Sequence, residues 1–235
     1  MDFSFTKDQE MIRSSVREFL KKECPKDKIR ELKGGEKGFD PKVWKKMVRL
    51  GFLGLVIPEE YGGTEGDIFD LVIFMEEAGR NILPAPYFST VCLCSMALLE
   101  YGTDEQKKKY LPKIVNKGAI WSLAIKEASD SYDMEDIRLR ADLQGGGYVL
   151  NGEKLFVPYA NSADYLLVVA RTDDVDAAGG AQAGGVRAAH AKPHGAAAGA
   201  AQAVAEEDAQ AAIGGSEALE EQAGLSSRHT DGGQE

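Results

Sequence analysis

Apolar residues recur at helical spacing along the first half of the chain, and residues that favour helix caps stand before each run. This pattern predicts helices that begin after Thr6, Asp40, Asp67 and Thr103, and a strongly apolar helix over Phe88 to Tyr101. Thr6 and Thr103 are each followed three residues later by Gln, which is the capping-box spacing. In the helix after Asp67, the predicted apolar side is formed by Ile68, Leu71, Val72 and Met75.

Beyond about Gly118 the apolar pattern takes the period of β-strands. Strand-like segments follow at Trp121 to Ile125, Ile137 to Asp142, Tyr148 to Val157 and Tyr165 to Ala170. Gly145–Gly147 predicts a hairpin turn, and Asn151–Gly152 predicts a second tight turn between two strands. Because helices precede strands along the chain, the sequence predicts an α+β fold, with an all-helical domain over 1–118 and a partial antiparallel β domain over 119–173.

An abrupt change of composition follows at about Thr172. Residues 174–235 are rich in Ala and Gly, and they contain no Phe, Tyr or Trp. Such a segment buries too little apolar surface to offset the entropy of ordering it, so it is expected to be a disordered, protease-sensitive tail. A shift of reading frame or an assembly error explains so sharp a change, and the alternative is a genuine acidic, low-complexity extension.

A β domain cut short at this point has an incomplete sheet. Its last predicted strand, Tyr165 to Ala170, is uncharged and β-prone, and one of its apolar faces is expected to be exposed. We therefore expect Lys at Leu167 or Val169 to reduce aggregation more than it disturbs the helical domain.

Charge and cysteine content limit the classes of function. The formal net charge is -10, whereas a nucleic-acid surface needs clustered Lys and Arg, so no nucleic-acid partner is predicted. Cys92 and Cys94 stand in an apolar run and are interpreted as buried free thiols; the alternative, a metal site, lacks the usual ligand spacing, and no metal is predicted. With neither a signal peptide nor a membrane span in the sequence, a cytoplasmic location is expected.

Three motifs stand in order along the chain. The first runs from Trp44 through Pro58–Gly63, the second from Tyr101 to Lys107, and the third from Tyr148 to Lys154. The Pro and Gly residues of the first also predict a loop of fixed geometry over Leu53 to Gly63. Together the motifs resemble those of the acyl-CoA dehydrogenases, and the resemblance covers essentially all of the chain from residue 3 to residue 172.

The resemblance implies a protein with an N-terminal helical domain, a middle β domain and a C-terminal four-helix domain. It implies FAD bound between the last two domains, an acyl-CoA substrate and a role in fatty acid metabolism. In the family a glutamate removes the α-proton of the thioester, and the β-hydrogen leaves as hydride to the flavin. No part of this chain resembles the C-terminal domain, so no catalytic residue is nominated, and the chain is expected to be truncated and inactive alone.

The resemblance also implies which residues face the flavin. They form two segments, Leu123, Ala124, Ile125 and Lys126 in the first and Phe156, Val157 and Pro158 in the second. Lys126 stands where Thr is usual, whereas Glu127 matches the family, and Tyr132 is the candidate substrate-binding residue. Pro158 lacks the hydroxyl and the N–H of the family's Thr, and Phe156 replaces a Trp.

Two interpretations account for these departures. In one, the chain has lost its own flavin site and is a non-catalytic subunit that pairs with a full-length partner dehydrogenase. In the other, backbone groups still hold FAD despite the changed side chains. The expected partners are therefore an acyl-CoA and another subunit, in a homo- or hetero-oligomer.

Overall fold

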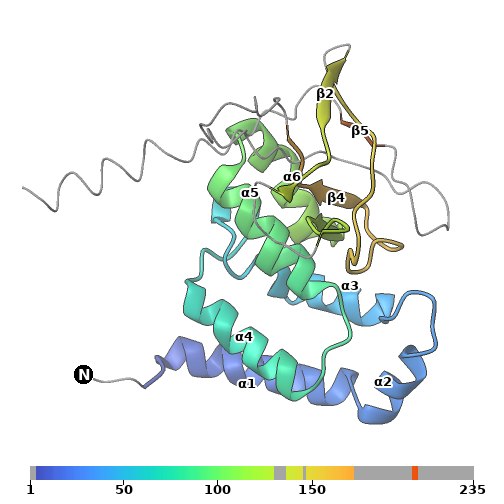
Figure 1. Ribbon diagram of the computed structural model, residues 1–235. Helices are drawn as coiled ribbons and strands as arrows, with labels where there is room; N and C mark the ends of the chain where they lie inside the picture. Colours follow the sequence, from blue (N-terminus) through green and yellow to red (C-terminus); the bar gives the residue numbers. More distant parts are fainter. Residues whose placement is uncertain (1–3, 130–135, 145–146, 172–202, 206–235) are drawn as a thin grey trace, which may run out of the picture.

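A computed structural model of the chain describes residues 4–129, 136–144, 147–171 and 203–205. Helices form the first part of the molecule, and short strands gather at one end of it (Figure 1). The helical segments are α1 (Lys7–Glu23), α2 (Lys26–Leu32), α3 (Pro41–Arg49), η1 (Phe52–Gly54), η2 (Glu59–Tyr61), α4 (Ile68–Arg80), η3 (Phe88–Ser95), α5 (Met96–Tyr101) and α6 (Asp104–Lys117). None of the described helices is long and apolar enough to cross a bilayer.

The helix caps predicted from the sequence are confirmed. The Thr6 hydroxyl accepts from the N–H of Gln9 at 3.2 Å, and the Gln9 side chain accepts from the N–H of Thr6 at 3.1 Å. The same reciprocal arrangement opens α6, and aspartate carboxylates cap α3 and α4. These side chains satisfy N–H groups that have no partner within the helix, which explains why α1, α3, α4 and α6 begin where they do.

Helix α4 departs from the predicted pattern of burial. Leu71 and Phe74 are buried, but Ile68 and Val72 are 53% and 56% exposed. The predicted apolar side, formed by Ile68, Leu71, Val72 and Met75, is therefore only partly buried. Because α4 is apolar around most of its circumference, helical spacing alone fits two different faces.

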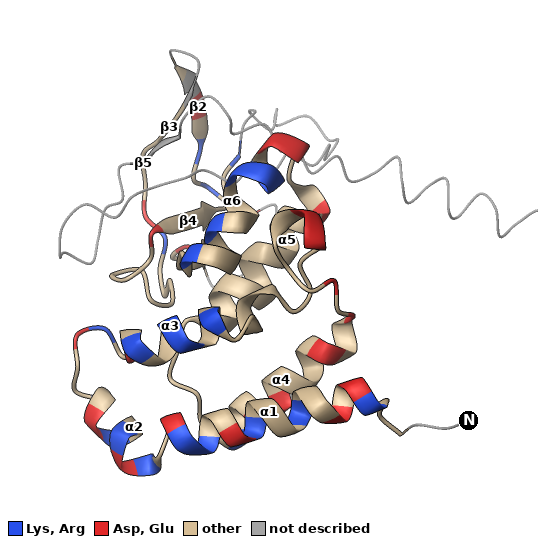
Figure 2. Cartoon of the chain, turned by 180° about the vertical axis from the view of Figure 1, so that it is seen from behind, with Lys and Arg blue, Asp and Glu red and all other residues tan. Residues whose placement is uncertain are grey.

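A carboxylate buried between α1 and α4 joins these two helices, which lie side by side in both views (Figures 1 and 2). Glu77 is completely buried, and Arg17 donates to its two oxygens at 2.6 and 3.0 Å. Side-chain nitrogens of Arg13 and Arg80 lie 3.6 and 3.7 Å from the same carboxylate. The hydrogen bonds from Arg17 outweigh the effect of burial and hold the pKa of the Glu77 carboxyl below its usual value.

The apolar segment from Phe88 to Tyr101 is helical, as predicted, but its first part is wound differently. η3 is a π-helical segment that continues directly into α5. The Ser95 hydroxyl donates to the Thr90 carbonyl at 2.9 Å, so a side chain satisfies a backbone group inside the wide turns. The apolar pattern does not distinguish π-helical from α-helical turns.

The loop predicted over Leu53 to Gly63 is confirmed, and its shape depends on two glycines. Gly62 has a φ of +90°, a conformation that side chains rarely adopt. Gly63 approaches Ile57 so closely that a Cβ on Gly63 would lie 1.8 Å from the Ile57 carbonyl oxygen. Glycine is therefore required at both positions for the chain to turn here.

Two small sheets follow the helices. Their strands are β1 (Trp121–Ala124), β2 (Ala141–Gln144), β3 (Gly147–Leu150), β4 (Tyr165–Val168) and β5 (Ala203–Ala205). β1 pairs with β4, and β3 lies between β2 and β5 with antiparallel pairing on both sides. Gln144 stands opposite Gly147, which confirms a hairpin at the predicted position, although Gly145 and Gly146 lie outside the described residues.

The α+β fold is confirmed, but details of the β region differ from the prediction. β1 and β4 run parallel, whereas antiparallel pairing was predicted throughout. The tight turn predicted at Asn151–Gly152 was wrong, because the described residues 151–164 contain no strand. A Cβ on Gly152 would lie 2.6 Å from Cδ1 of Leu139, so this glycine permits a close approach instead of a hairpin.

One further strand prediction needs correction. The strand expected from Ile137 begins only at Ala141, after an isolated bridge between Arg140 and Arg171. β5 falls within the segment 174–235 that was expected to be disordered, and the remainder of that segment lies outside the described residues.

Aromatic rings join the helices to the first sheet. The Trp121 ring stacks on the Tyr165 ring, with ring centroids 4.7 Å apart. It also packs edge to face with Tyr110, with ring centroids 5.1 Å apart. Leu167 and Val169 are buried, so the expected exposure of an apolar face on this strand was wrong. Lys at either position would place a charge in the core. Neither substitution is therefore expected to reduce aggregation.

The Thr90 hydroxyl provides the polar part of this junction. It accepts from the N–H of Trp121 at 3.1 Å and donates to the carbonyl of Trp121 at 3.0 Å. Thr90 and Trp121 are both buried. One hydroxyl on η3 thus satisfies the outward-facing peptide groups at the start of β1.

We expect Thr90→Val to destabilise the chain by about 2 kcal/mol, because valine keeps the shape of the side chain but leaves buried peptide groups without a partner. Urea unfolding followed by far-UV circular dichroism measures the difference. Ser162→Ala is the control, because the Ser162 hydroxyl donates to the exposed side chain of Asn161. Equal stability of the Thr90→Val variant and the wild type would show that the junction does not depend on this hydroxyl.

Candidate functional site

The structure brings together the two segments that were predicted to face a cofactor. The first, Leu123–Lys126, comprises the end of β1 and the residues after it, and the second, Phe156–Pro158, belongs to the connection from β3 to β4. The Leu155 N–H donates to the Lys126 carbonyl at 2.8 Å, and the Ser122 hydroxyl donates to the Pro158 carbonyl. Residues far apart in the sequence therefore form one surface at the end of the molecule.

The register of β1 decides which backbone groups this surface presents. The carbonyls of Ile120 and Ala124 accept from β4 and the residues beside it, at 2.8 Å from Asp164 and 3.0 Å from Val169. Alternate residues of a strand point their peptide groups to opposite edges, so the peptide group of Leu123 faces away from β4. A backbone donor and acceptor at this edge suit the polar rim of a flat ring system.

Phe156 is held in an unusual conformation at the surface. Its φ is +54°, and its side chain is 88% exposed. Tyr159, three residues later, has a φ of +53° and is half-buried against Phe39, with ring centroids 5.9 Å apart. Non-glycine residues with positive φ are strained and concentrate at functional sites. The contact of Tyr159 with the helical part thus anchors a strained loop that presents Phe156 outward.

Lys126, which stands where the family usually has Thr, is partly buried. Its ammonium group donates to the carbonyl of Ser129, within the same turn of chain. Tyr132, the candidate substrate-binding residue, lies outside the described residues.

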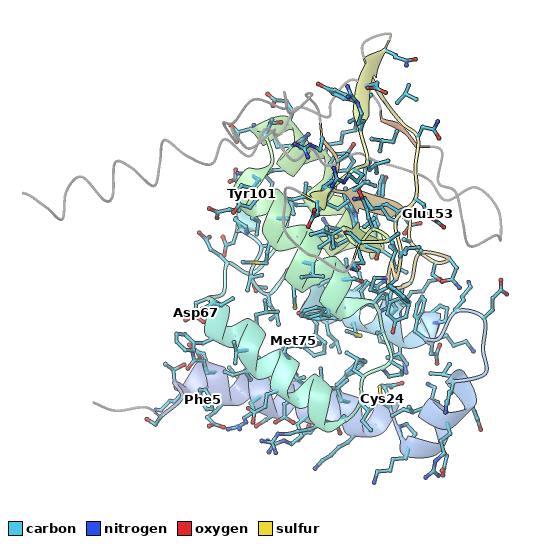
Figure 3. All side chains as sticks on the ribbon, viewed as in Figure 1. Phe5, Cys24, Asp67, Met75, Tyr101 and Glu153 are labelled. Carbon is cyan, nitrogen blue, oxygen red and sulfur yellow. The ribbon has the colours of Figure 1, made fainter. Side chains whose placement is uncertain are left out.

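An ion pair with largely buried side chains, which the sequence analysis did not identify, joins residues next to the two segments. The Lys154 ammonium is 2.7 Å from Oε1 of Glu127, and Glu127 also accepts from the N–H groups of Arg138 and Leu139. Burial by itself raises the pKa of the Glu127 carboxyl, but the hydrogen bonds from Lys154 and these N–H groups outweigh it, and the pKa is held below the usual value. Lys154 follows Glu153, which is labelled in Figure 3 on the connection between β3 and β4.

The cysteines do not contribute to this surface. Burial raises the pKa of Cys92 to about 11 and that of Cys94 to about 12, so both are protonated thiols at neutral pH. Cys94 is buried as predicted, whereas Cys92 is only partly buried. No group of three or more metal-binding side chains occurs in the part of the chain that the structure describes.

Comparisons with known proteins agree with the architecture described above. The family described as acyl-CoA dehydrogenase, N-terminal domain, matches residues 6–118. The probable acyl-CoA dehydrogenase YngJ of Bacillus subtilis (strain 168) is 34% identical over 174 residues, which cover 73% of this chain and 45% of that protein. Acryloyl-CoA reductase (NADH) of Anaerotignum propionicum is 34% identical over 176 residues, which cover 74% of this chain and 44% of that protein.

Solved structures give the same result. The glutaryl-coenzyme A dehydrogenase glutaryl-CoA complex is similar with a TM-score of 0.75 and 27% identity, over 91% of this chain and 59% of that chain. The ChsE4-ChsE5 complex from Mycobacterium tuberculosis has a TM-score of 0.70 and 26% identity, over 91% of this chain and 57% of the matched chain. The chain spans less than half the length of the curated relatives named above.

Proposed function

Because the chain belongs to the acyl-CoA dehydrogenase family, we propose that residues 119–171 supply one side of a flavin site for the α,β-dehydrogenation of an acyl-CoA thioester in fatty acid metabolism. The single observation that carries this proposal is the pair of hydrogen bonds, from Leu155 to Lys126 and from Ser122 to Pro158, that bring the two segments close together. On this proposal, the helical residues 1–118 form a support against which the flavin-facing surface is built. The cytoplasmic location and the truncation of the chain stay predictions.

The residues of this surface fit a flat, largely apolar ring system with a polar rim. Phe156 offers an exposed aromatic face, and the edge of β1 offers the peptide group of Leu123. When bound, FAD supplies the acceptor for the hydride that leaves the β-carbon. Pro158 has no N–H, so any backbone donor in the second segment belongs to its neighbours, and Phe156 and Val157 would hold one face of the ring.

Proton abstraction needs a base that the described surface does not offer. Glu127 directly follows the first segment, and its carboxylate oxygens already accept from Lys154, Arg138 and Leu139. Its lowered pKa also makes it a weak base at neutral pH. The α-proton of the thioester would therefore have to be removed by a residue outside the described part of the chain.

A second candidate function is that of a subunit that pairs with a flavin-bearing dehydrogenase. Two observations favour it. The ring of Phe156 is almost fully exposed, as expected of a residue that another chain or ligand covers. One of the similar solved structures, ChsE4-ChsE5, is a complex of two different proteins.

We expect the purified 235-residue chain, without any partner, to show no turnover of a short-chain acyl-CoA in an assay that follows reduction of an artificial electron acceptor. Added FAD should still be bound, which flavin absorbance after gel filtration will detect. A full-length family enzyme in the same assay serves as the positive control. Measurable turnover by the chain alone would show that it contains a competent base, and a chain that never retains flavin would favour the subunit function.

A further inference from the structure

We infer that the ion pair between Glu127 and Lys154 is a latch that fixes the two cofactor-facing segments relative to each other. Both residues thereby position the candidate flavin surface. This inference rests on the proposed function. Both side chains bond to backbone groups, those of Arg138, Leu139 and Ile125, so each is a positioning residue and not a catalytic one. The latch is defined as these two side chains and the backbone groups that they bond.

Glu127 accepts hydrogen bonds from three donors in two separate parts of the chain. Its Oε1 accepts from the Lys154 ammonium at 2.7 Å and from the Leu139 N–H at 3.0 Å, and its Oε2 accepts from the Arg138 N–H at 2.7 Å. The Glu127 side chain is 11% exposed and that of Lys154 is 6% exposed. A buried carboxylate with three donors has little freedom to change direction.

Lys154 completes the connection to the end of β1. Its ammonium also donates to the carbonyl of Ile125 at 3.1 Å, and the next residue, Leu155, donates its N–H to the carbonyl of Lys126 at 2.8 Å. The first cofactor-facing segment therefore receives two consecutive hydrogen bonds from residues that directly precede Phe156. A shift of Lys154 would move the strained loop that presents the Phe156 ring.

The burial of this pair distinguishes it from solvent-exposed ion pairs. Arg30 and Asp27, for example, form a pair whose side chains are 77% and 89% exposed. Taking two charges out of water is costly, and the cost is offset only when good geometry and further hydrogen bonds satisfy the remaining donors and acceptors. Glu127 and Lys154 meet this condition through the peptide groups of Arg138, Leu139 and Ile125. The pair is therefore suited to fix the positions of the two cofactor-facing segments relative to each other.

The test compares Lys154→Met and Glu127→Gln with the wild-type chain by amide hydrogen exchange and by FAD titration followed through flavin anisotropy. Exchange at the amides of Leu139 and Leu155 should become at least about tenfold faster, because both amides lose the structure that protects them. The affinity for FAD should fall at least about tenfold. Exchange in α1, α4 and α6 should stay unchanged. Asp27→Asn, in the exposed pair, is the matched control and should alter neither measurement.

Two further variants separate positioning from simple charge pairing. Lys154→Arg keeps a cationic donor and should restore part of the protection and part of the FAD affinity lost in Lys154→Met. The exchanged pair Glu127→Lys with Lys154→Glu should not restore them, because Lys at residue 127 cannot accept from the N–H groups of Arg138 and Leu139. Recovery by the exchanged pair would overturn the latch, because charge alone would then be sufficient.

The outcomes for the latch and for the proposed function are distinguishable. If the wild-type chain does not bind FAD, the proposed flavin surface is refuted, and hydrogen exchange still decides the latch. If exchange at Leu139 and Leu155 is the same in wild type and Lys154→Met, the latch is refuted. If the helices α1, α4 and α6 also exchange faster in Lys154→Met, the pair is a general element of stability and the positioning role is refuted.

Discussion

Gly63→Ala should destabilise the chain by at least about 3 kcal/mol, because the new methyl group would collide with backbone that cannot move aside. The Cβ would lie 1.8 Å from the carbonyl oxygen of Ile57, 2.5 Å from its carbonyl carbon and 2.8 Å from the carbonyl oxygen of Gly54. All three are main-chain atoms of the loop that carries the first sequence motif. The loop must therefore open to accommodate the methyl group, and it then loses its internal hydrogen bonds.

Gly79→Ala is the matched control for this prediction. Gly79 lies in α4, and no heavy atom of another element lies within 4 Å of the position that the alanine methyl group would take, so the methyl group meets open space. Alanine is the better helix former, and we expect Gly79→Ala to be about 0.5–1 kcal/mol more stable than wild type. Urea unfolding followed by circular dichroism measures both variants. If both glycines respond alike, the close approach at Gly63 does not constrain the loop.

Glu77→Gln should destabilise the chain by about 3 kcal/mol, because it removes the buried negative charge that Arg17, Arg13 and Arg80 share. The expected loss is at the lower end for a broken buried ion pair, since the Arg17 side chain is 39% exposed and can recover hydration. Thermal or urea unfolding at neutral pH measures the loss. Glu76→Gln is the control; Glu76 pairs with Arg13 and Arg80 at the surface, and a much smaller change is expected there.

The same carboxylate predicts a dependence on pH. The pKa of Glu77 is lowered in the folded chain, chiefly by the hydrogen bonds from Arg17. Its contribution to stability is therefore fully present above the unfolded value of about 4.3 and is lost as the pH falls through the lower folded value. The difference in stability between wild type and Glu77→Gln should accordingly shrink below about pH 4.3. If the stability difference between the two proteins stayed constant down to about pH 2, the charge on Glu77 would not be its cause.

Local chemistry explains which parts of the fold could be predicted. A cap such as Thr6 with Gln9 involves residues three apart, so the sequence contains all of the information needed to place it. The buried face of α4 was not determined in this way, because Ile68 and Val72 fit the helical period as well as Leu71 and Phe74 do. Only the packing of α4 against other elements separates the two faces.

The β region shows the same limit over longer distances. Tyr165 to Ala170 was recognised as a strand because it is apolar throughout, but its direction relative to β1 depends on the path of the long stretch of chain between them. A continuous apolar run is itself more typical of parallel strands buried on both faces, and this signal favoured the pairing that is found. Gly152 was misread because a glycine that permits contact with Leu139 looks the same in sequence as one in a turn.

The candidate site was only partly predictable for a related reason. The family resemblance indicated Leu123–Lys126 and Phe156–Pro158, and hydrogen bonds through Leu155 and Ser122 bring the two segments close together. Lys154 was part of a quoted motif, but its partner Glu127 lies twenty-seven residues earlier, and no local spacing connects the two. The positive φ of Phe156 likewise has no sequence signal, because glycine and asparagine are the residues usually associated with it.

The stacking of Trp121 on Tyr165 has a spectroscopic consequence. The chain contains two tryptophans, and both are buried, Trp44 within the helices and Trp121 at the start of β1. The indole N–H of Trp44 donates to the Gly118 carbonyl at 2.8 Å, whereas that of Trp121 has no hydrogen-bond partner among the described residues. The two fluorophores therefore have different surroundings, and replacing either one with phenylalanine isolates the emission of the other. Trp121 stands two residues before Leu123, so its emission provides an intrinsic optical signal for any chromophore that binds beside β1.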